Sequence, residues 1–312
     1  MVLDKLSQSK GIVVAKKANY SIVEIDREEC NYSSEIQCKN DHRLLCTIRQ
    51  RLIHNGSSIN VGDRVSIESI DWDTNRATIS NLYSRKSFIS KPPVANVTEV
   101  IVVISVKNPI FDFDQASRFL LTAEQTGLNV SLLLTKVDLI TSNELASQMR
   151  RLNSWGYSPL PISIKSAKGL DVWLNQIKLT KLAVLCGPSG VGKSSLLNYL
   201  LPKASIPIGD LSVKLKRGRN TTRHVQLYSL GADTRVADTP GFNRPELKVD
   251  PIGLQLLFPE IRYQSKKVSC KFRNCLHLDE PGCVIETSWE RYQQYRNIIK
   301  EMIILRRLYQ GD

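Results

Sequence analysis

The stretch GPSGVGKSS (187–195) decides the fold of this chain, because it contains the complete pattern G-x-x-x-x-G-K-[ST]. The apolar segment KLAVLC precedes it, and SSLLNYLL, which reads as a helix, follows it. Strand, glycine-rich loop and helix in this order are typical of a phosphate-binding loop in an α/β nucleotide-binding domain. We therefore predict such a domain.

Each part of this loop has a chemical role that its residue types can fill. Gly190 and Gly192 let backbone N–H groups converge on phosphate oxygens, and the N-terminus of the following helix adds its dipole. We expect Lys193 to neutralise the β- and γ-phosphates and Ser194 to supply a hydroxyl to Mg²⁺. The predicted phosphate-binding residues are Gly187, Pro188, Ser189, Gly190, Val191, Gly192, Lys193, Ser194 and Ser195.

Two further segments predict the switches that respond to a γ-phosphate. VADTPGF (236–242) reads as an apolar strand that ends in the D-x-x-G pattern. There Asp238 would hold Mg²⁺ through water, and the Gly241 N–H would contact the γ-phosphate. Before it, the basic loop KRGRNTTRH (216–224) offers Thr221 and Thr222, one of which can close over the metal, and Thr222 is the preferred candidate. The predicted catalytic residues are Lys193, Thr222, Asp238 and Gly241, and the predicted Mg²⁺ ligands are Ser194, Thr222 and Asp238.

Two motifs earlier in the chain predict recognition of a guanine base. LLLTKVDLI (132–140) reads as a buried strand followed by a Thr-Lys-x-Asp turn. Asp138 can accept hydrogen bonds from the guanine N1–H and exocyclic amine, Lys136 would lie along the ring, and Thr135 stands where Asn is commoner. In SIKSAKG (163–169) a backbone N–H can donate to the guanine O6. The predicted base-binding residues are Thr135, Lys136, Val137, Asp138, Ser166, Ala167 and Lys168.

The order of these motifs is unusual, because base recognition comes before the phosphate loop. Strands such as EVIVVISV alternate with helices such as TSNELASQMRRLNSWG, which predicts a parallel sheet covered on both faces. Such a sheet tolerates circular permutation, because chain termini often lie close together and only a new linker is needed. We predict a circularly permuted α/β P-loop GTPase domain over residues 89–245, with LNQIKLTKL (174–182) as the linker.

The two ends of the chain predict two further domains. Residues 1–88 hold five short strands separated by turns, which suits a small closed β-barrel, OB-like or SH3-like, and we predict the OB-like form. The Pro-Pro segment SRKSFISKPPVANVTEV is predicted to be a linker. Residues 246–312 predict a mostly helical zinc-binding domain. Thr287 and Glu290 have the spacing of a capping box, which indicates the start of a terminal helix. We expect the basic residues of this helix on a solvated face: Arg291, Arg296, Lys300, Arg306 and Arg307.

Cys270, Cys275, His277 and Cys283 form the pattern C-x4-C-x-H-x5-C. Four soft ligands so close together suit tetrahedral Zn²⁺, and a full protein shell leaves no open position for catalysis. We predict one structural Zn²⁺ per chain, in preference to unrelated buried cysteines or to a redox site, because a histidine lies among them and no C-x-x-C is present. The other cysteines, Cys30, Cys38, Cys46 and Cys186, are expected to be structural.

Composition indicates a polyanionic partner. The 312 residues carry a net charge of +13, and the sequence pI is about 9.4. A surface that merely leans basic is the alternative, but the cations gather at two places, where rRNA phosphates are the expected contacts. One group lies beside the cysteines (Arg262, Lys266, Lys267, Lys271, Arg273) and one in the first switch (Lys214, Lys216, Arg217, Arg219, Arg223).

No apolar run approaches the ~18 residues that cross a bilayer. The seven cysteines are an odd number, which argues against a disulfide framework and for a reducing cytosol. We therefore expect a soluble, cytoplasmic, monomeric protein without a membrane partner.

GPSGVGKSSLLN, RGRNTTRHVQL, DTPGF and CKFRNCLHLDEPGC together resemble the circularly permuted GTPases of the RsgA (YjeQ) family along the whole chain. The resemblance implies an OB barrel, a permuted GTPase domain and a zinc domain. It also implies binding to the small ribosomal subunit late in maturation, with GTP hydrolysis stimulated by the subunit and linked to release. Asn220 replaces a family histidine, and Phe242 stands where many GTPases have a glutamine that orients water. Slow intrinsic turnover is therefore expected.

Two alternatives remain open at this point. A P-loop ATPase or nucleotide kinase would need no Thr-Lys-x-Asp turn. A zinc-dependent RNA-binding module could use the nucleotide only as a switch, with negligible turnover, and Asn220 and Phe242 are consistent with it. Nucleotide competition tests the first alternative, and GTP turnover with excess small subunits tests the second.

Overall fold

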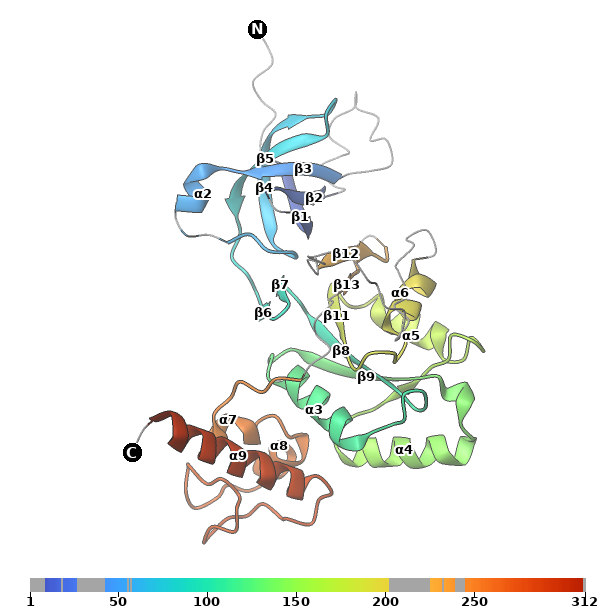
Figure 1. The fold of residues 1–312 in the computed structure, drawn as a ribbon, viewed down its shortest axis with the longest axis vertical. Helices are drawn as coiled ribbons and strands as arrows, with labels where there is room; N and C mark the ends of the chain where they lie inside the picture. The colour runs from blue at the N-terminus through green and yellow to red at the C-terminus, as the bar shows by residue number, and fades with distance from the viewer. Residues whose placement is uncertain are drawn as a thin grey trace, which may run out of the picture. The chain divides into compact units, whose positions relative to one another are not determined.

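The computed structural model describes residues 9–17, 19–26, 43–54, 56, 58–201, 225–231, 233–238 and 245–310 (Figure 1). The chain divides into two compact units. The barrel unit comprises residues 1–100, 174–186 and 193–243, and the base-recognition unit comprises residues 101–173, 187–192 and 244–312. In the part of the chain described, no helix has both the length and the apolar character needed to span a membrane.

The N-terminal strands close into a barrel, as the sequence predicts. The strands pair in the order β1-β2-β3-β5-β4, and β4 pairs back with β1. All of these pairs are antiparallel except β3–β5, which is parallel. The elements are β1 (Ser9–Lys16), β2 (Ser21–Ile25), β3 (Arg43–Ile48), α2 (Gln50–His54), β4 (Arg64–Asp71) and β5 (Arg76–Leu82).

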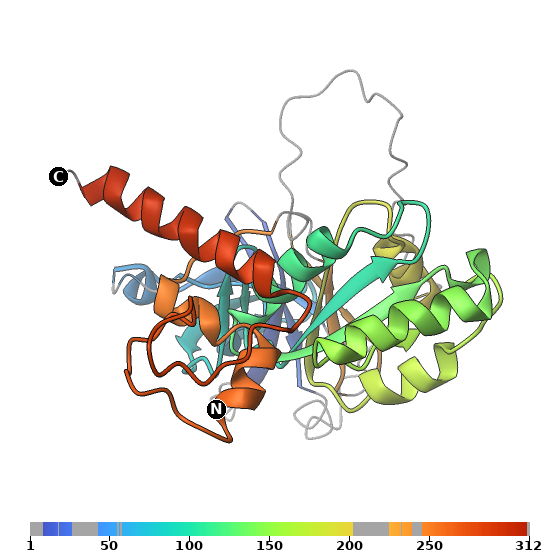
Figure 2. The same ribbon diagram turned by 90° about the horizontal axis from the view of Figure 1, so that it is seen from below.

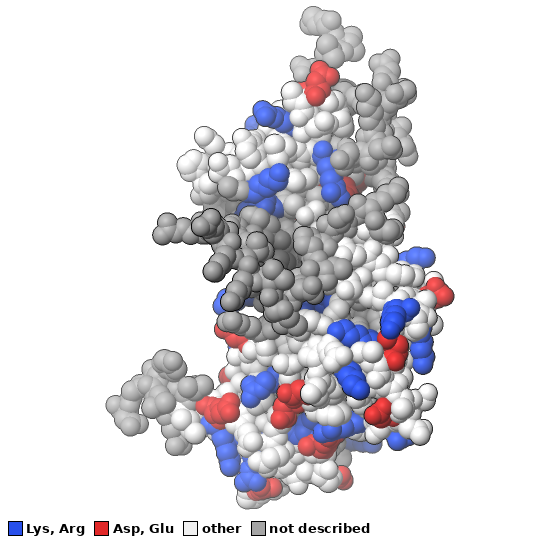
Figure 3. All heavy atoms as spheres, turned by 45° about the vertical axis from the view of Figure 1, so that its right-hand side comes forward, with Lys and Arg blue, Asp and Glu red and all other residues white. Residues whose placement is uncertain are grey.

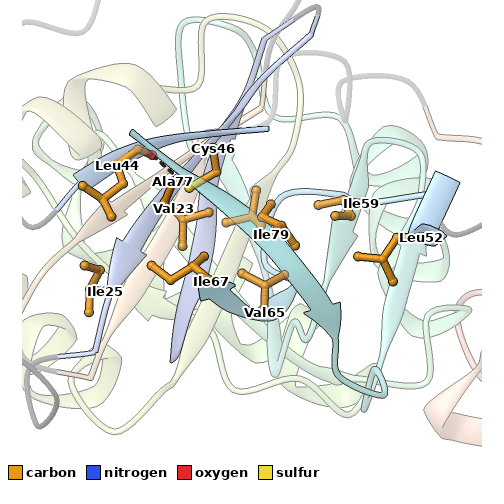
Figure 4. Close-up of a cluster of buried hydrophobic side chains, with 11 residues drawn as sticks. Val23, Ile25, Leu44, Cys46, Leu52, Ile59, Val65, Ile67, Ala77 and Ile79 are labelled. Atoms are coloured by element: carbon orange, nitrogen blue, oxygen red, sulfur yellow. Dashed lines mark hydrogen bonds between the residues drawn. The ribbon is translucent and has the colours of Figure 1, made fainter. Parts of the chain in front are cut away.

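Alternate side chains of these strands fill the barrel interior (Figure 4). In β2, for example, Val23 and Ile25 point inward and are buried, whereas Glu24 between them is only half-buried. Cys46 belongs to this core, and burial raises the pKa of its thiol to about 12. Its expected structural role is therefore supported, whereas Cys30 and Cys38 lie outside the described residues.

The segment with the Pro-Pro pair, which the sequence predicts to be a linker, instead forms a small hairpin. Its strands β6 (Phe88–Ser90) and β7 (Pro93–Ala95) pair antiparallel, and Val94 and Ala95 are fully buried. Buried apolar side chains between the prolines and the next strand hold the segment in place, which composition alone does not reveal.

The barrel unit also contains three strands from the P-loop domain. β11 (Leu182–Cys186) pairs parallel with β13 (Arg235–Asp238), and β12 (Gln226–Ser229) pairs antiparallel with β13. β12 is also bridged to β1 of the barrel, with Ala15 opposite Gln226. The strand order in this unit is therefore β11-β13-β12-β1, continuing into the barrel.

The base-recognition unit holds the strands β8 (Glu99–Ser105), β9 (Asn129–Thr135) and β10 (Leu160–Pro161), in the order β10-β9-β8. Helices α3 (Phe113–Glu124) and α4 (Ser142–Ser154) follow β8 and β9 and cover the same face of these strands (Figures 1 and 2). Two successive right-handed β-α-β crossovers that step in the same direction along the sheet place both helices on one face. Asp112 caps α3, and Thr141 with Glu144 forms a capping box at α4.

The predicted linker 174–182 is partly structured. Helix α5 (Leu170–Ile177) extends into it, and β11 begins at its last residue, so only 178–181 connects regular elements. α5 has apolar residues at helical spacing, and Trp173 and Ile177 are buried. The permuted motif order predicts a connection at this point in the chain, but it does not show that most of the connection is helical or buried.

The C-terminal segment packs helices α7 (Pro251–Gln255), α8 (Pro259–Ser265) and α9 (Tyr292–Gln310) around one core. Phe258, Trp289 and Tyr295 meet there edge to face or tilted. The predicted capping box at Thr287 is wrong, because α9 begins five residues later, at Tyr292. The Glu290 carboxylate instead accepts hydrogen bonds from Arg151 and from Nε1 of Trp155.

Candidate nucleotide site and metal centre

The phosphate loop connects β11 to helix α6 (Lys193–Leu200), as the sequence predicts. Gly187 has φ +143°, and a Cβ there would lie 2.1 Å from the Val103 carbonyl oxygen, so only glycine fits. Gly190 and Gly192 also have positive φ, with values of 79° and 101°. Among the described residues, apart from its chain neighbours, no atom lies within 4 Å of the position that a Gly192 Cβ would take, so this glycine is required by its backbone conformation rather than by crowding.

The Thr-Lys-x-Asp turn is hydrogen-bonded directly to this loop. The Thr135 hydroxyl, at the end of β9, lies 2.6 Å from the Val191 carbonyl oxygen and donates to it. The Lys136 ammonium donates to the carbonyl oxygen of Gly190 at 2.8 Å and also to that of Asn108. Two consecutive residues thus hold the phosphate loop against the base-recognition turn. The Lys136 ammonium is thus already hydrogen-bonded to two carbonyl oxygens. That the Lys136 side chain lies along a base ring stays a prediction.

Asp138 lies in the short 3₁₀ turn η1 (Val137–Leu139) and is exposed, so its carboxylate is accessible to a ligand. One oxygen, Oδ1, accepts a hydrogen bond of 2.5 Å from the hydroxyl of Ser163. That hydroxyl in turn accepts from the backbone N–H of Ser166 at 3.2 Å. Ser163 is fully buried, and its hydroxyl therefore connects the two predicted base-binding motifs.

The Ser-Ala-Lys loop is closed by its own backbone. The Ser163 N–H donates to the Lys168 carbonyl, and Ala167 adopts a left-handed conformation with φ 56°. Ser166, Ala167 and Lys168 are all exposed residues, although the Ser166 N–H is already bonded to the Ser163 hydroxyl. Sequence reasoning missed Ser163 and Asn108 as contributors. The only signal for Ser163 was its place at the strand end in SIKSAKG.

Of the predicted switch residues, the structure places only one. Asp238 ends β13, which runs parallel to β11 with Val184 opposite Ala237, so it lies at the sheet edge where the phosphate loop begins. Thr222 and Gly241 lie outside the described residues, as do Asn220, His224 and Phe242. The roles predicted for Thr222, Asp238 and Gly241 remain predictions.

Cys186, the last residue of β11, is a core residue. It is 1% exposed, and burial raises the pKa of its thiol to about 12, with the nearby Lys193 charge acting in the opposite direction. A thiol of this kind is neutral at physiological pH and does not act as a ligand.

The four predicted metal ligands lie together, with all their donor atoms within 4.8 Å of one another. His277 Nδ1 is 3.6, 3.5 and 3.4 Å from the sulfurs of Cys270, Cys275 and Cys283, and the sulfurs of Cys270 and Cys283 are 3.9 Å apart. Tetrahedral zinc with bonds of about 2.3 Å to sulfur and 2.0 Å to nitrogen separates S from N by ~3.5 Å and S from S by ~3.8 Å. The cluster can therefore hold one zinc ion.

Neighbouring groups orient these ligands. His277 donates from Nε2 to Oε1 of Gln255 at 2.6 Å, which leaves the Nδ1 lone pair facing the three sulfurs. Burial lowers the pKa of His277, so its imidazole is in the neutral, ligating form. Glu280 accepts from the N–H groups of Leu276 and Leu278, which shapes the loop between the ligands. Glycine is needed at 282, where φ is +79° and a Cβ would lie 2.8 Å from the Lys271 side chain.

The described basic residues differ in the part of the surface on which they lie. On the face in Figure 3, Lys and Arg are interspersed with Asp and Glu. Beside the metal ligands, Lys266, Lys267, Lys271 and Arg273 are exposed and make no ion pair among the described residues. Arg262 pairs instead with Glu124, and the cations of the first switch lie outside the described residues.

The expectation that Arg291 lies on a solvated face is wrong. Its side chain is 2% exposed and forms a bidentate ion pair with Glu260, with distances of 2.7 and 2.5 Å. Its guanidinium also lies over the ring of Trp155, 4.7 Å from the centroid.

The RsgA GTPase family model matches residues 82–248. A small ribosomal subunit biogenesis GTPase RsgA from Prochlorococcus marinus is 55% identical over 298 residues, which cover 94% of this chain and 96% of the relative. A relative of the same name from Synechococcus sp. is 50% identical over 311 residues, covering 100% and 99%.

Two solved structures share the fold. YjeQ from Thermotoga maritima matches with a TM-score of 0.75 and 30% identity, over 95% of this chain and 99% of that one. YloQ, described as a circularly permuted GTPase, matches with a TM-score of 0.76 and 26% identity, over 97% and 98%. The predicted fold class and the permuted motif order are confirmed.

Proposed function

Because the chain belongs to the RsgA GTPase family, and is therefore a GTP hydrolase, we propose that it acts in maturation of the small ribosomal subunit. The observation that supports this role most strongly is end-to-end similarity. Relatives named for it match 94% and 100% of the chain at 55% and 50% identity. In this role it works in the cytoplasm as a monomer.

Guanine is selected by Asp138 in this proposal. Its carboxylate accepts the N1–H and the exocyclic amine of the base, which adenine cannot offer in that arrangement. The Ser163 hydrogen bond holds the carboxylate in one orientation, so little is lost in ordering it when the base binds. Ala167 and Lys168 are exposed on the loop that follows, and in this proposal one of their N–H groups donates to O6 of the base.

The phosphates bind the loop 187–195, whose backbone N–H groups and Lys193 stabilise the negative charge that shifts during hydrolysis. The hydrogen bonds from Thr135 and Lys136 to the loop carbonyls keep these donors in place before the substrate arrives. Mg²⁺, which Ser194, Thr222 and Asp238 would hold, supplies further positive charge at the β- and γ-phosphates.

Intrinsic turnover is slow in this proposal, because Asn220 cannot act as a general base and the Phe242 side chain cannot hydrogen-bond water. Binding to the small subunit raises the rate, and hydrolysis accompanies release. The rRNA contacts include the exposed Lys266, Lys267, Lys271 and Arg273, which are held near the metal ligands. The zinc ion is structural, since Cys270, Cys275, His277 and Cys283 fill all four positions.

The decisive experiment measures GTP turnover with and without purified small ribosomal subunits. We expect slow hydrolysis alone and at least tenfold faster hydrolysis with saturating subunits, on the order of a typical allosteric coupling. Large ribosomal subunits are the matched control and should have no such effect. Background turnover even with excess small subunits would instead favour an RNA-binding module that only senses the nucleotide.

Nucleotide choice is tested by competition. GTP should displace a fluorescent GDP analogue at far lower concentration than ATP, and Asp138→Asn should weaken GTP binding on the order of a hundredfold. The same variant should gain affinity for xanthosine triphosphate, whose C2 carbonyl can accept from the new amide. ATP binding as tight as GTP binding, unchanged in Asp138→Asn, would contradict guanine selection.

A further inference from the structure

Within the barrel unit, the barrel is joined to the two strands that lead to the predicted switches. β12 begins at Gln226, directly after the segment that contains the first switch, and β13 ends at Asp238, where the second switch starts. β12 is bridged to β1, with Ala15 opposite Gln226. A change at either switch therefore reaches the wall of the barrel by a short path, which is covalent as far as β12 or β13 and runs through strand pairing from there.

One carboxylate sits at this junction. Oε1 of Glu24, on barrel strand β2, lies 2.9 Å from Nη2 of Arg235 on β13 and 3.1 Å from the hydroxyl of Ser229 on β12. Oε2 faces Nε of Arg43, on the neighbouring barrel strand, at 3.5 Å. Glu24 thus contacts one residue from each switch strand and one from the barrel wall.

The barrel core makes no use of Glu24, because its side chain points away from the interior that Val23 and Ile25 fill. The side chains of Glu24 and Arg235 are only 16% and 14% exposed, so the ion pair is largely shielded from solvent. Burial by itself would raise the pKa of Glu24. Arg235, through its charge and hydrogen bond, and Ser229 lower it by more, so the carboxylate stays ionised at neutral pH.

One N–H group of the Arg235 guanidinium takes no part in the ion pair. Nε of Arg235 is buried and has no hydrogen-bond partner among the described residues. The guanidinium therefore holds Glu24 through one nitrogen, although its planar fork can hold a carboxylate through two. Engaging Nε as well would require a shift of β13 relative to Glu24, and it would give the pair a second geometry of the kind that a coupling element needs.

We propose that Glu24 is a positioning residue for GTP hydrolysis, which couples the state of the barrel to both switches through Arg235 and Ser229. The inference rests on the proposed function, since it assigns a path by which the small subunit, by contacting the barrel, accelerates hydrolysis. Glu24 acts on the switch strands alone and contacts neither the predicted base site nor the described phosphate-loop residues.

The test compares basal and subunit-stimulated GTP turnover in Glu24→Gln, which keeps the shape of the side chain and removes its charge. We expect basal turnover and GTP affinity to stay within about twofold of the unaltered chain, and the ratio of stimulated to basal turnover to fall roughly tenfold. Ser229→Ala, which removes only the hydroxyl contact, should lower the ratio by a smaller factor and remains informative if Glu24→Gln is unstable.

Asp26→Asn is the matched control. It disrupts the bidentate ion pair of Asp26 with Arg64, which lies on the same barrel but touches neither switch strand, and it should leave the stimulation ratio unchanged. If Glu24 acts through Arg235, the double variant Glu24→Gln with Arg235→Gln should lose no more stimulation than either single variant.

The outcomes separate the two proposals. Lack of stimulation in the unaltered chain would overturn the proposed function and the coupling role together. Normal stimulation in both Glu24→Gln and Ser229→Ala would overturn the coupling role alone. So would an equal loss of basal and stimulated turnover, because a defect of the nucleotide site or of folding lowers both rates together.

Discussion

The most demanding prediction concerns the buried Arg291 in the base-recognition unit. Its guanidinium pairs with both oxygens of Glu260, donates to the Ser117 hydroxyl at 3.2 Å, and lies over the rings of Trp155 and Phe258. These partners come from α8, from α3 and from the end of α4. The Arg291 side chain therefore joins the C-terminal segment, which carries the candidate zinc ligands, to the helices that follow the base-recognition strands.

The magnitude follows from burial. Arg291→Ala leaves the Glu260 carboxylate, whose side chain is 6% exposed, without its partner cation. Breaking a buried pair in this way costs about 3–5 kcal/mol, because the remaining charge stays desolvated. Replacing both partners by apolar residues of similar size, as in Arg291→Met with Glu260→Leu, removes that charge as well and should cost little or even stabilise.

The assay is urea unfolding followed by near-ultraviolet circular dichroism. With a slope of about 2 kcal/mol per molar urea, the single variant should lower the midpoint by roughly 1.5–2.5 M. Arg151→Ala is the matched control, because the side chains of Arg151 and Glu290 are 41% and 35% exposed in their ion pair, which should contribute only about 1 kcal/mol. A single variant no less stable than this control, or a double variant as unstable as the single one, would refute the reasoning.

Three further predictions address the nucleotide and metal sites. Gly187→Ala should abolish GTP binding, because its Cβ would meet the Val103 carbonyl, whereas Gly231→Ala, with open space around it, should bind normally; equal affinities would contradict the steric argument. Cys186, with a pKa of about 12 against an ordinary 9.0, should resist iodoacetamide at pH 8 until denaturant is added. Because the unfolded chain ionises this thiol first, it should also reduce stability as pH rises above about 9, and the Cys186→Ala variant should show a weaker decline. Cys275→Ser should lower the zinc content measured by atomic absorption from one ion per chain to nearly none and lower the unfolding temperature, whereas Cys46→Ser should keep its zinc.

The nucleotide motifs could be predicted from sequence because their chemistry requires particular residues at fixed spacing. Gly187 has a backbone conformation and close neighbours that only glycine tolerates. Because the loop requires glycine at this position, the residue type itself marks the position in the sequence. The zinc ligands could be predicted for a similar reason, because a tetrahedral shell needs four donors and the four donor residues lie close together in sequence. Ser163 was missed for the opposite reason. A serine hydroxyl has no sequence signature, and its bond to Asp138 exists only because two strand ends meet in the folded sheet.

The errors at the start of the last helix have a common physical origin. Thr287 and Glu290 have capping-box spacing, but Trp155 Nε1 and Arg151 bind the Glu290 carboxylate, and these partners come from α4 and its C-cap, far away in sequence. Arg291 was assigned to solvent because charged residues surround it in sequence, whereas its burial depends on Glu260 lying opposite. Local patterns predict caps and surfaces well only where no tertiary partner competes for the same polar atoms.

The contacts also bear on which parts of the chain respond to the switches. The C-terminal segment with the candidate zinc ligands follows the second switch directly in sequence. It would therefore be expected to move with that switch. Yet within its own unit that segment is held to the base-recognition helices by Arg291 and by the pair of Arg262 with Glu124. The switch strands are instead bonded to the barrel, through the β1–β12 bridge and Glu24. Since a rearrangement passes first through the contacts that its strands make, the barrel is the better candidate to sense the nucleotide state, although it is the most distant domain from the second switch along the chain.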